Sequence, residues 1–337
     1  MRLYRLIYDP ASGLRQSDLL GPDQPFKPYP LVHRIRFNAG LRAVVFAVAL
    51  AGAALAAAVV FLLVAAGQSG LADITQLASQ ITALMPGAAL VELVGAVAAY
   101  IVLTSALEAR RWPSELAWRR IGGLFRGMAL GFILITFNVG LLAIVGAYRI
   151  TGFNPGYSPW ADLIMAGLTA GVAEELIFRG VAFRLLEDTF GTVVALAASS
   201  VLFGAMHLTN PDGTLLGGLG IALATLVLPA VYVATRSLWW PIGLHFAWNI
   251  AQGPIWGSVI SGSGGTSSML RTTWKGPVWL TGGEFGIEAS VVVTVTVFAF
   301  SVWLLVMAHR SGNFVAPSWT RRRVLNSQAR PTQPATV

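Results

Sequence analysis

Long apolar stretches separated by short polar segments run along most of this 337-residue chain. A helix needs about 20 apolar residues to cross the hydrocarbon core of a bilayer, which is about 30 Å thick. Eight stretches approach this length, and we expect a membrane-spanning helix in each: 41–66, 88–106, 127–147, 160–184, 191–208, 214–235, 239–256 and 287–308. The pattern therefore predicts an all-α fold, a polytopic transmembrane helical bundle of about eight spans with both termini cytoplasmic.

The polar segments outside these spans define the predicted organisation. Residues 1–40 contain arginines and aspartates but no apolar run, so we expect a cytoplasmic N-terminal tail rather than a cleavable signal peptide. Residues 41–310 form the predicted transmembrane domain, and residues 311–337 a disordered cytoplasmic tail. The glycine- and serine-rich segment 257–286 is predicted to be an outer loop, either a flexible link or a lid.

Composition supports a membrane protein and narrows its partners. Hydrophobic residues make up 55% of the chain and charged residues 11%, whereas soluble domains carry about a quarter charged residues. With eight spans, 20 of the 23 Lys and Arg lie on the cytoplasmic side and only Arg149, Arg271 and Lys275 lie outside. We then expect the net charge of +8 to orient the protein in the membrane and to contact anionic lipid. Nucleic acid is not an expected partner. The absence of cysteine excludes a thiolate nucleophile and Cys-ligated zinc.

Most of the ionisable residues inside the predicted spans lie between positions 174 and 249. Such residues are costly in a bilayer and usually face a cavity or a partner, so they indicate a functional site. They form three motifs on three predicted helices: Glu174-Glu175-x-x-x-Arg179, Phe203-x-x-x-His207 and His245-x-x-x-Asn249. The four-residue spacing places both named residues of the second and third motifs on one helix face.

The spacing in the first motif separates the two glutamates. Glu175 and Arg179 are four residues apart with the acid first, which favours an ion pair and is equally typical of a structural bridge. Glu174 lies about 100° round the helix, so we expect it to point into a cavity instead. Gly167 and Gly171, just before it, allow close approach of another helix.

Two of the polar residues are predicted to lie at the same depth in the membrane, and a third is not. Glu174 and His207 lie at similar distances from the tip of the predicted hairpin near Thr189, within about one helical turn of each other. His245 lies only eight residues after the turn at Arg236. It is therefore predicted to be shallower, unless its helix is tilted or that turn is buried.

These residue types can hydrolyse an amide. A carboxylate in a low-dielectric site can act as a general base towards water, and a histidine beside it can orient or share that water. A second histidine and an asparagine can donate to a developing oxyanion. Glu174, His207 and His245 could also supply the three protein ligands of a catalytic zinc, so the residues alone leave a metal-free and a metal-dependent site open.

The three motifs, in this order on three helices, resemble the CAAX protease and bacteriocin-processing (CPBP, or Abi) family, which includes the type II CAAX prenyl endopeptidases. The resemblance implies an eight-helix intramembrane peptidase with its catalytic core at 160–252. It implies that Glu174 and His207 activate water and that His245 and Asn249 form an oxyanion pocket. It gives a supporting role to Glu175, Arg179 and Phe203. We expect a metal-free mechanism that requires no cofactor, with Zn as the alternative.

The predicted function is therefore that of an intramembrane endopeptidase acting on a membrane-associated peptide or protein. We expect a multi-pass protein of a bacterial cytoplasmic (inner) membrane. The alternative is a non-enzymatic membrane protein, either a transporter or a scaffold that binds a partner helix at the same site. Outside the motifs, Glu92 and Asp162 are expected near the outer interface with solvated carboxylates, and the run 217–220 at a close helix crossing.

Overall fold

A computed structural model describes residues 39–321 and 323 of the chain, except 70–73, 108–112, 266 and 322. Most of the predicted tail 1–40 and the end of the predicted tail 311–337 therefore lie outside the described residues. The described chain is mostly helical, as predicted. Its main helices are α4 (Ala39–Ser69), α5 (Ile74–Val102), α6 (Gly122–Ile144), α7 (Trp160–Asp162), α8 (Arg184–Phe190), α9 (Thr192–Met206), α10 (Leu215–Ala224), α11 (Val227–Thr235), α12 (Trp239–Ile250), α13 (Val278–Thr281) and α14 (Val291–Arg310).

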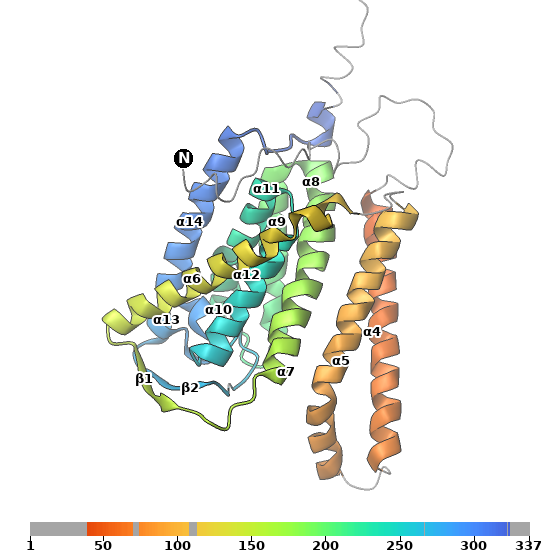
Figure 1. The fold of residues 1–337 in the computed structure, drawn as a ribbon. Helices are drawn as coiled ribbons and strands as arrows, with labels where there is room; N and C mark the ends of the chain where they lie inside the picture. Colours follow the sequence, from red (N-terminus) through yellow and green to blue (C-terminus); the bar gives the residue numbers. More distant parts are fainter. Residues whose placement is uncertain (1–38, 70–73, 108–112, 266, 322, 324–337) are drawn as a thin grey trace, which may run out of the picture.

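Several segments are wound as π-helix, with hydrogen bonds to the fifth residue along. They are η2 (Leu103–Leu107), η5 (Leu163–Glu174), η6 (Leu176–Phe183) and η8 (Ala251–Ile255). Together, α7, η5, η6 and α8 make one long helical rod, and α4 and α5 form a hairpin beside it (Figure 1). The predicted span 160–184 thus exists as a helix, but with a wider winding than an α-helix over most of its length.

The prediction of an all-α fold is wrong at one end of the molecule. Strand β1 (Tyr148–Phe153) pairs antiparallel with β2 (Leu270–Trp274), and Tyr148 lies opposite Trp274. The β-branched residues in both segments favour extended backbone, but the segments are far apart in sequence, so no hairpin signal connects them. The predicted outer loop 257–286 therefore contains a strand and the short helix α13, not a flexible link.

Among the described residues, six helices are long and apolar enough to cross a membrane. They cover Ala39–Ala56, Pro86–Ser105, Trp118–Ile144, Thr192–Thr209, Leu215–Thr235 and Val291–Arg310. The predicted spans 160–184 and 239–256 are also helical, but the first carries several charges and the second is short. The chain is a multi-pass membrane protein, while eight spans and cytoplasmic termini stay predictions.

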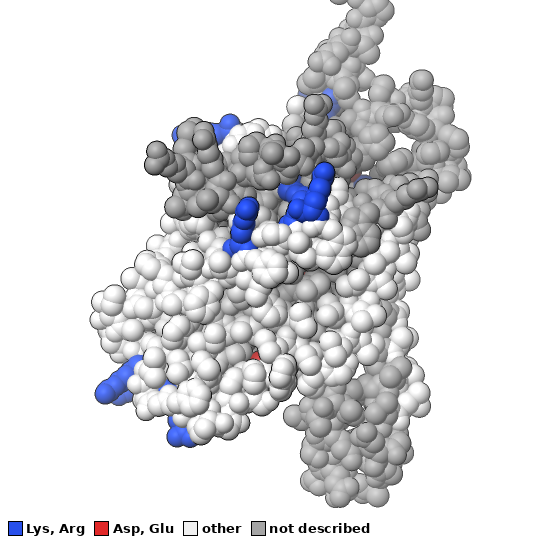
Figure 2. Space-filling view, viewed as in Figure 1, with Lys and Arg blue, Asp and Glu red and all other residues white. Residues whose placement is uncertain are grey.

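The surface of the molecule is consistent with a lipid environment. Large apolar side chains are exposed on several helices: Leu55 of α4 is 67% exposed, Ile133 of α6 61% and Val201 of α9 63%. Lys and Arg gather towards the two ends of the molecule and leave a broad middle without Lys or Arg on this face (Figure 2). The lower group in this view lies at the end that carries β1 and β2, where Arg149 and Arg271 are located.

Helices α6 and α12 pack backbone to backbone through glycines. A Cβ on Gly243 would lie 2.0 Å from the Leu124 carbonyl oxygen, and one on Gly127 would lie 2.2 Å from the Trp240 carbonyl oxygen. Small residues at such a crossing let membrane helices gain van der Waals contact that larger side chains would prevent. The crossing holds α12, which carries His245 and Asn249, firmly against the bundle.

We expect Gly243→Ala to destabilise the protein by about 3 kcal/mol, because an added methyl group must push two backbones apart. Gly140→Ala in α6 is the matched control, since a Cβ there meets nothing within 4 Å. That control should be neutral or stabilising by about 0.5–1 kcal/mol. Thermal unfolding in detergent measures both, and equal melting temperatures for the two variants would contradict the close crossing.

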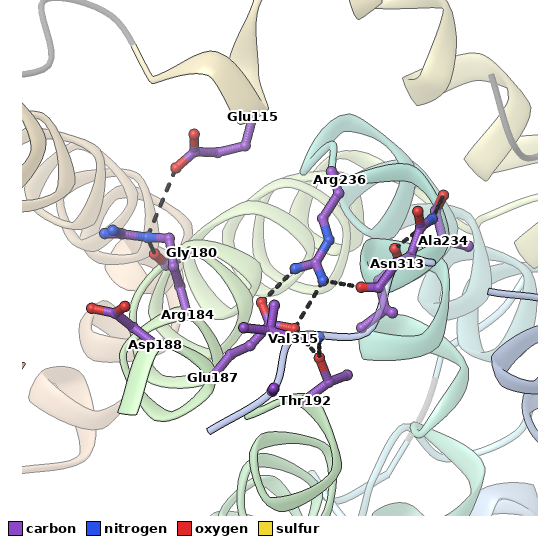
Figure 3. Close-up of polar contacts among 12 residues, drawn as sticks. Glu115, Gly180, Arg184, Glu187, Asp188, Thr192, Ala234, Arg236, Asn313 and Val315 are labelled. Atoms are coloured by element: carbon purple, nitrogen blue, oxygen red, sulfur yellow. Dashed lines mark hydrogen bonds and ion pairs between the residues drawn. The ribbon is translucent and has the colours of Figure 1, made fainter. Parts of the chain in front are cut away.

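A buried polar network fixes the turn between α11 and α12 (Figure 3). The Arg236 guanidinium donates two hydrogen bonds to the Glu187 carboxylate, one of them 2.9 Å long, and a third of 2.5 Å to the Asn313 carbonyl oxygen. Thr192 Oγ1 donates to the same carboxylate over 2.5 Å. Burial by itself lowers the pKa of Arg236, but the charge of Glu187 more than offsets this and keeps that pKa above its ordinary value. Arg236 therefore stays charged inside the protein.

The same network reaches both ends of the described chain. Asp188 forms ion pairs with Arg42 of α4 at 3.0 Å and with Arg321 at 3.2 Å. Val315 is 5% exposed, and its backbone N–H donates to Thr192 Oγ1 over 2.8 Å. The start of the segment predicted as a tail is thus packed against α8 and α9.

Candidate active site

The three sequence motifs come together between three helical segments. Glu174, Glu175 and Arg179 lie where η5 passes into η6, at the middle of the long rod. His207 follows the end of α9, and α12 provides the residues of the third motif. π-Helical turns are often found at functional sites, and here Glu174 and Arg179 lie in π-helical segments with Glu175 between them.

Glu175 joins the first and third motifs. Its Oε1 accepts a hydrogen bond of 2.7 Å from Arg179 Nη1 and one of 2.9 Å from His245 Nδ1. Glu175 and Arg179 are 0% and 1% exposed, so this contact lies in the protein interior. The expected pair of Glu175 with Arg179 is present. Its link to His245, 70 residues away in the chain, could not be read from the sequence spacing.

Phe203 lies among these polar groups. The Arg179 guanidinium stands 4.7 Å from its ring centre, a favourable cation–π distance. The rings of His207 and His245 lie 4.7 Å and 6.1 Å from the same ring. Phe203 is 1% exposed, so one aromatic side chain sets the positions of a cation and two imidazoles.

Both imidazoles are oriented by a hydrogen bond at Nδ1. His207 Nδ1 lies 2.8 Å from the Phe203 carbonyl oxygen, which can only accept, so this nitrogen donates. His245 Nδ1 donates to the Glu175 carboxylate in the same way. In each neutral ring Nε2 is then the free nitrogen, with a lone pair for a proton or for water. His245 can act as a donor at Nε2 only as an imidazolium.

The expected mismatch in the depth of His245 is resolved by the buried turn. Arg236 is 6% exposed and pairs with Glu187, so the turn lies level with Glu187 and not beyond the hairpin tip. The path from Arg236 to His245 along α12 is similar in length to the path from Glu187 back to Glu175 along the rod. The small excess on the rod is offset because a π-helix advances less per residue than an α-helix. His245 therefore meets Glu175 directly.

Glu174 takes no part in the hydrogen bonds of this cluster and lines a cavity, as the sequence predicts, although its carboxylate interacts electrostatically with His245 and His207. Its side chain lines an open cleft of about 550 Å³ between the α4–α5 hairpin and the rod. The other lining residues are Ala54, Ala58, Ala88, Ala89, Glu92, Met165, Thr169, Ala170, Ala173, Ile177, Phe178 and Met206. Oε2 of Glu174 is buried and has no hydrogen-bond partner. A buried oxygen without a partner costs stability, which is typical of a group kept for chemistry.

Residues 257–289, here called the outer segment, form a wall beside the two histidines. A chamber of about 20 Å³ has His207, His245, Ser261 and Glu288 among its lining residues, and this volume is enough for about one water molecule. Glu288 is 3% exposed, and its Oε2 accepts from the backbone N–H and the Oγ–H of Ser261, both over 2.7 Å. The segment is therefore clamped to the site by residues that the motifs did not include.

Asn249 lies at the contact between α12 and η5. Its Nδ2 donates to the Ala166 carbonyl oxygen over 3.0 Å. Nearby, a Cβ on Gly167 or Gly171 would come within about 3 Å of Phe246 of α12. The predicted close approach at these glycines is thus present, and the amide of Asn249 holds the two helices together at that level.

A catalytic zinc would need three protein ligands close together. Nε2 is the free nitrogen of His207 and of His245, and Glu174 lies on the wall of the cleft. Within the part of the chain that the structure describes, no three His, Cys, Asp or Glu side chains are grouped to hold a metal ion. The arrangement does not fit a zinc held by Glu174, His207 and His245, so no step below is assigned to a metal.

Fold and site together define a multi-pass membrane protein with a glutamate and two histidines buried between its helices. Residues 156–251 match the family model described as Type II CAAX prenyl endopeptidase Rce1-like, and this segment is an Rce1-like domain. The match confirms the resemblance to the CPBP family and contains all residues of the three motifs. It indicates a peptidase that acts on protein or peptide substrates in the membrane. No curated protein and no solved structure matched the chain.

Proposed function

We propose that this protein is an intramembrane endopeptidase whose general base is Glu174. The observation that carries the proposal is the position of the Glu174 carboxylate. It forms part of the wall of a 550 Å³ cleft, has a buried oxygen without a partner, and belongs to the Rce1-like domain. A peptide that enters the cleft would meet this carboxylate.

His207 and His245 take part in the chemical steps of the proposed hydrolysis. Glu174 takes one proton of a water molecule as the water oxygen attacks the carbonyl carbon, while Nε2 of His207 accepts a hydrogen bond from the other hydrogen of that water. His245, held as an imidazolium by Glu175, donates from Nε2 to the developing oxyanion. The C–N bond then breaks, and the proton taken from water passes to the leaving nitrogen.

Asn249 and the supporting residues complete the proposed site. Its second amide hydrogen is the further donor that we assign to the oxyanion. Arg179 neutralises Glu175, and Phe203 excludes water from the cluster. The mechanism requires no cofactor, so binding energy must come from the cleft and from these preorganised groups.

The experiment that tests this proposal is substrate trapping with chelator-washed protein. Glu174→Gln protein should retain membrane polypeptides that wild-type protein cuts and releases, because binding persists when the base is removed. Mass spectrometry identifies the retained polypeptides. Wild-type protein washed with a chelator and reconstituted in vesicles should cleave them at one internal bond.

Intact retained polypeptides after incubation with the wild type would refute the peptidase. They would favour the alternative of a transporter or partner-binding scaffold, as would a Glu174→Gln strain with full biological activity. Cleavage that disappears on chelator treatment and returns with zinc would instead establish a metal-dependent site.

A further inference from the structure

A second carboxylate lines the cleft and has no part in the mechanism above. Glu92 of α5 is a lining residue together with Glu174, although it lies outside the Rce1-like domain. Among the described residues, no hydrogen bond or ion pair involves its side chain. An intramembrane acid without a partner usually marks a binding or transport function.

Glu92 and Glu174 lie at nearly the same depth. Thr169 Oγ1 donates to the Ala89 carbonyl oxygen over 3.2 Å, which brings those two residues level with each other. α5 and the rod run in the same direction (Figure 1). Glu92 follows Ala89 by three residues and Glu174 follows Thr169 by five. At about 1.5 Å per residue of α-helix, and less in the π-helix η5, the backbones of the two glutamates differ in depth by no more than about 3 Å.

Apart from the two glutamates, the residues that line the cleft favour a narrow apolar ligand. Six of its lining residues are alanines, contributed by α4, α5 and η5. Its volume of about 550 Å³ lies in the range of ligand-binding cavities. The edge-to-face pair of Phe178 and Phe203, with ring centres 4.8 Å apart, lies between this cleft and the chamber at the histidines. Within the cleft the occupant therefore meets alanines and carboxylates, and it reaches the imidazoles only beside Glu174.

We propose that Glu92 is a specificity-determining residue that binds a lysine or arginine side chain of a membrane-embedded peptide segment. The inference rests on the proposed function, because hydrolysis at Glu174 requires a peptide at this depth. A positive side chain would supply the counter-charge that the described residues do not provide. In a low-dielectric cleft, such a pair discriminates strongly against an uncharged or acidic residue at the same position.

The test measures binding in protein that cannot hydrolyse. Glu174→Gln protein is reconstituted in phosphatidylcholine vesicles and titrated with apolar peptides that differ at one scanned position, which is Lys, Ala or Glu. At one position the Lys peptide should bind about tenfold more tightly than the Ala peptide, and the Glu peptide more weakly. Adding Glu92→Gln should remove this preference, and Glu92→Lys should reverse it towards the Glu peptide.

The control is Val94→Gln, because Val94 is 66% exposed on α5 and does not line the cleft. This variant should keep the preference for Lys. Equal affinities for the three peptides at every position, or a Lys preference that survives Glu92→Gln, would overturn the proposal. Loss of the preference when phosphatidylethanolamine is added would assign Glu92 to a lipid ammonium and also overturn it. Failure of the peptidase proposal would appear separately, as absent hydrolysis by the wild type.

Discussion

Glu174→Gln should reduce the rate of peptide cleavage at least 1000-fold while leaving the fold intact, which is on the order of what a positioned general base contributes. Glutamine has nearly the same shape but cannot take a proton from water. The protein should be as stable as the wild type or more stable by about 1 kcal/mol, because the substitution removes a negative charge whose buried oxygen has no hydrogen-bond partner. A catalytic loss without a loss of stability is the expected signature.

The measurements are single-turnover cleavage of a trapped substrate and thermal unfolding of the same preparation. Glu284→Gln is the matched control, because Glu284 is an exposed acid in the outer segment. It should change neither quantity. If Glu174→Gln protein cleaved at more than a tenth of the wild-type rate, Glu174 would not be the base. If it unfolded at a much lower temperature, Glu174 would be a structural residue.

Removing one partner of the Arg236–Glu187 pair should cost about 3–5 kcal/mol of stability, the largest effect that we expect outside the active site. Glu187 is 1% exposed and Arg236 6%. In Glu187→Ala the guanidinium stays buried with one carbonyl partner, that of Asn313. The turn that sets the depth of α12 then loses its anchor. Thermal or denaturant unfolding in detergent measures the loss.

A double variant distinguishes this effect from general damage. When both charges are replaced together, as in Glu187→Leu with Arg236→Met, no uncompensated charge stays buried, so the double variant should be more stable than Glu187→Ala. Glu284→Ala at the exposed surface should change stability by less than about 0.5 kcal/mol. A Glu187→Ala protein with wild-type stability would show that the network does not hold the turn.

The sequence predicted the elements of the site well because the relevant signals are local. A charged group in an apolar run is costly wherever the run packs, so Glu174, His207 and His245 could be singled out without a structure. Helix geometry alone predicts that the side chains of Glu174 and Glu175 point in different directions. In the structure Glu175 contacts His245, and Glu174 lines the cleft. The close approach at Gly171 follows from residue size in the same way.

Other features escaped prediction because they join distant residues. The Glu175 contact with His245 spans 70 residues, and Arg236 reaches Glu187 over 49. Ser261 and Glu288 carry no motif, and their place beside the histidines depends on how the outer segment folds back. β1 and β2 are too far apart in sequence to form a hairpin, so their pairing could not be predicted from a turn signal.

Hydropathy and the cost of buried charge act residue by residue, so a helical membrane protein and the polar residues that its helices bury can be predicted without a structure. The role of each of these residues depends on the tertiary packing. The packing of α12 against the rod brings His245 into hydrogen-bond contact with Glu175. Glu174 lies on the wall of the cleft. It also placed Glu92, expected at a solvated interface, on the wall of that cleft. Such pairings depend on which helix faces pack together, and local spacing does not encode that choice.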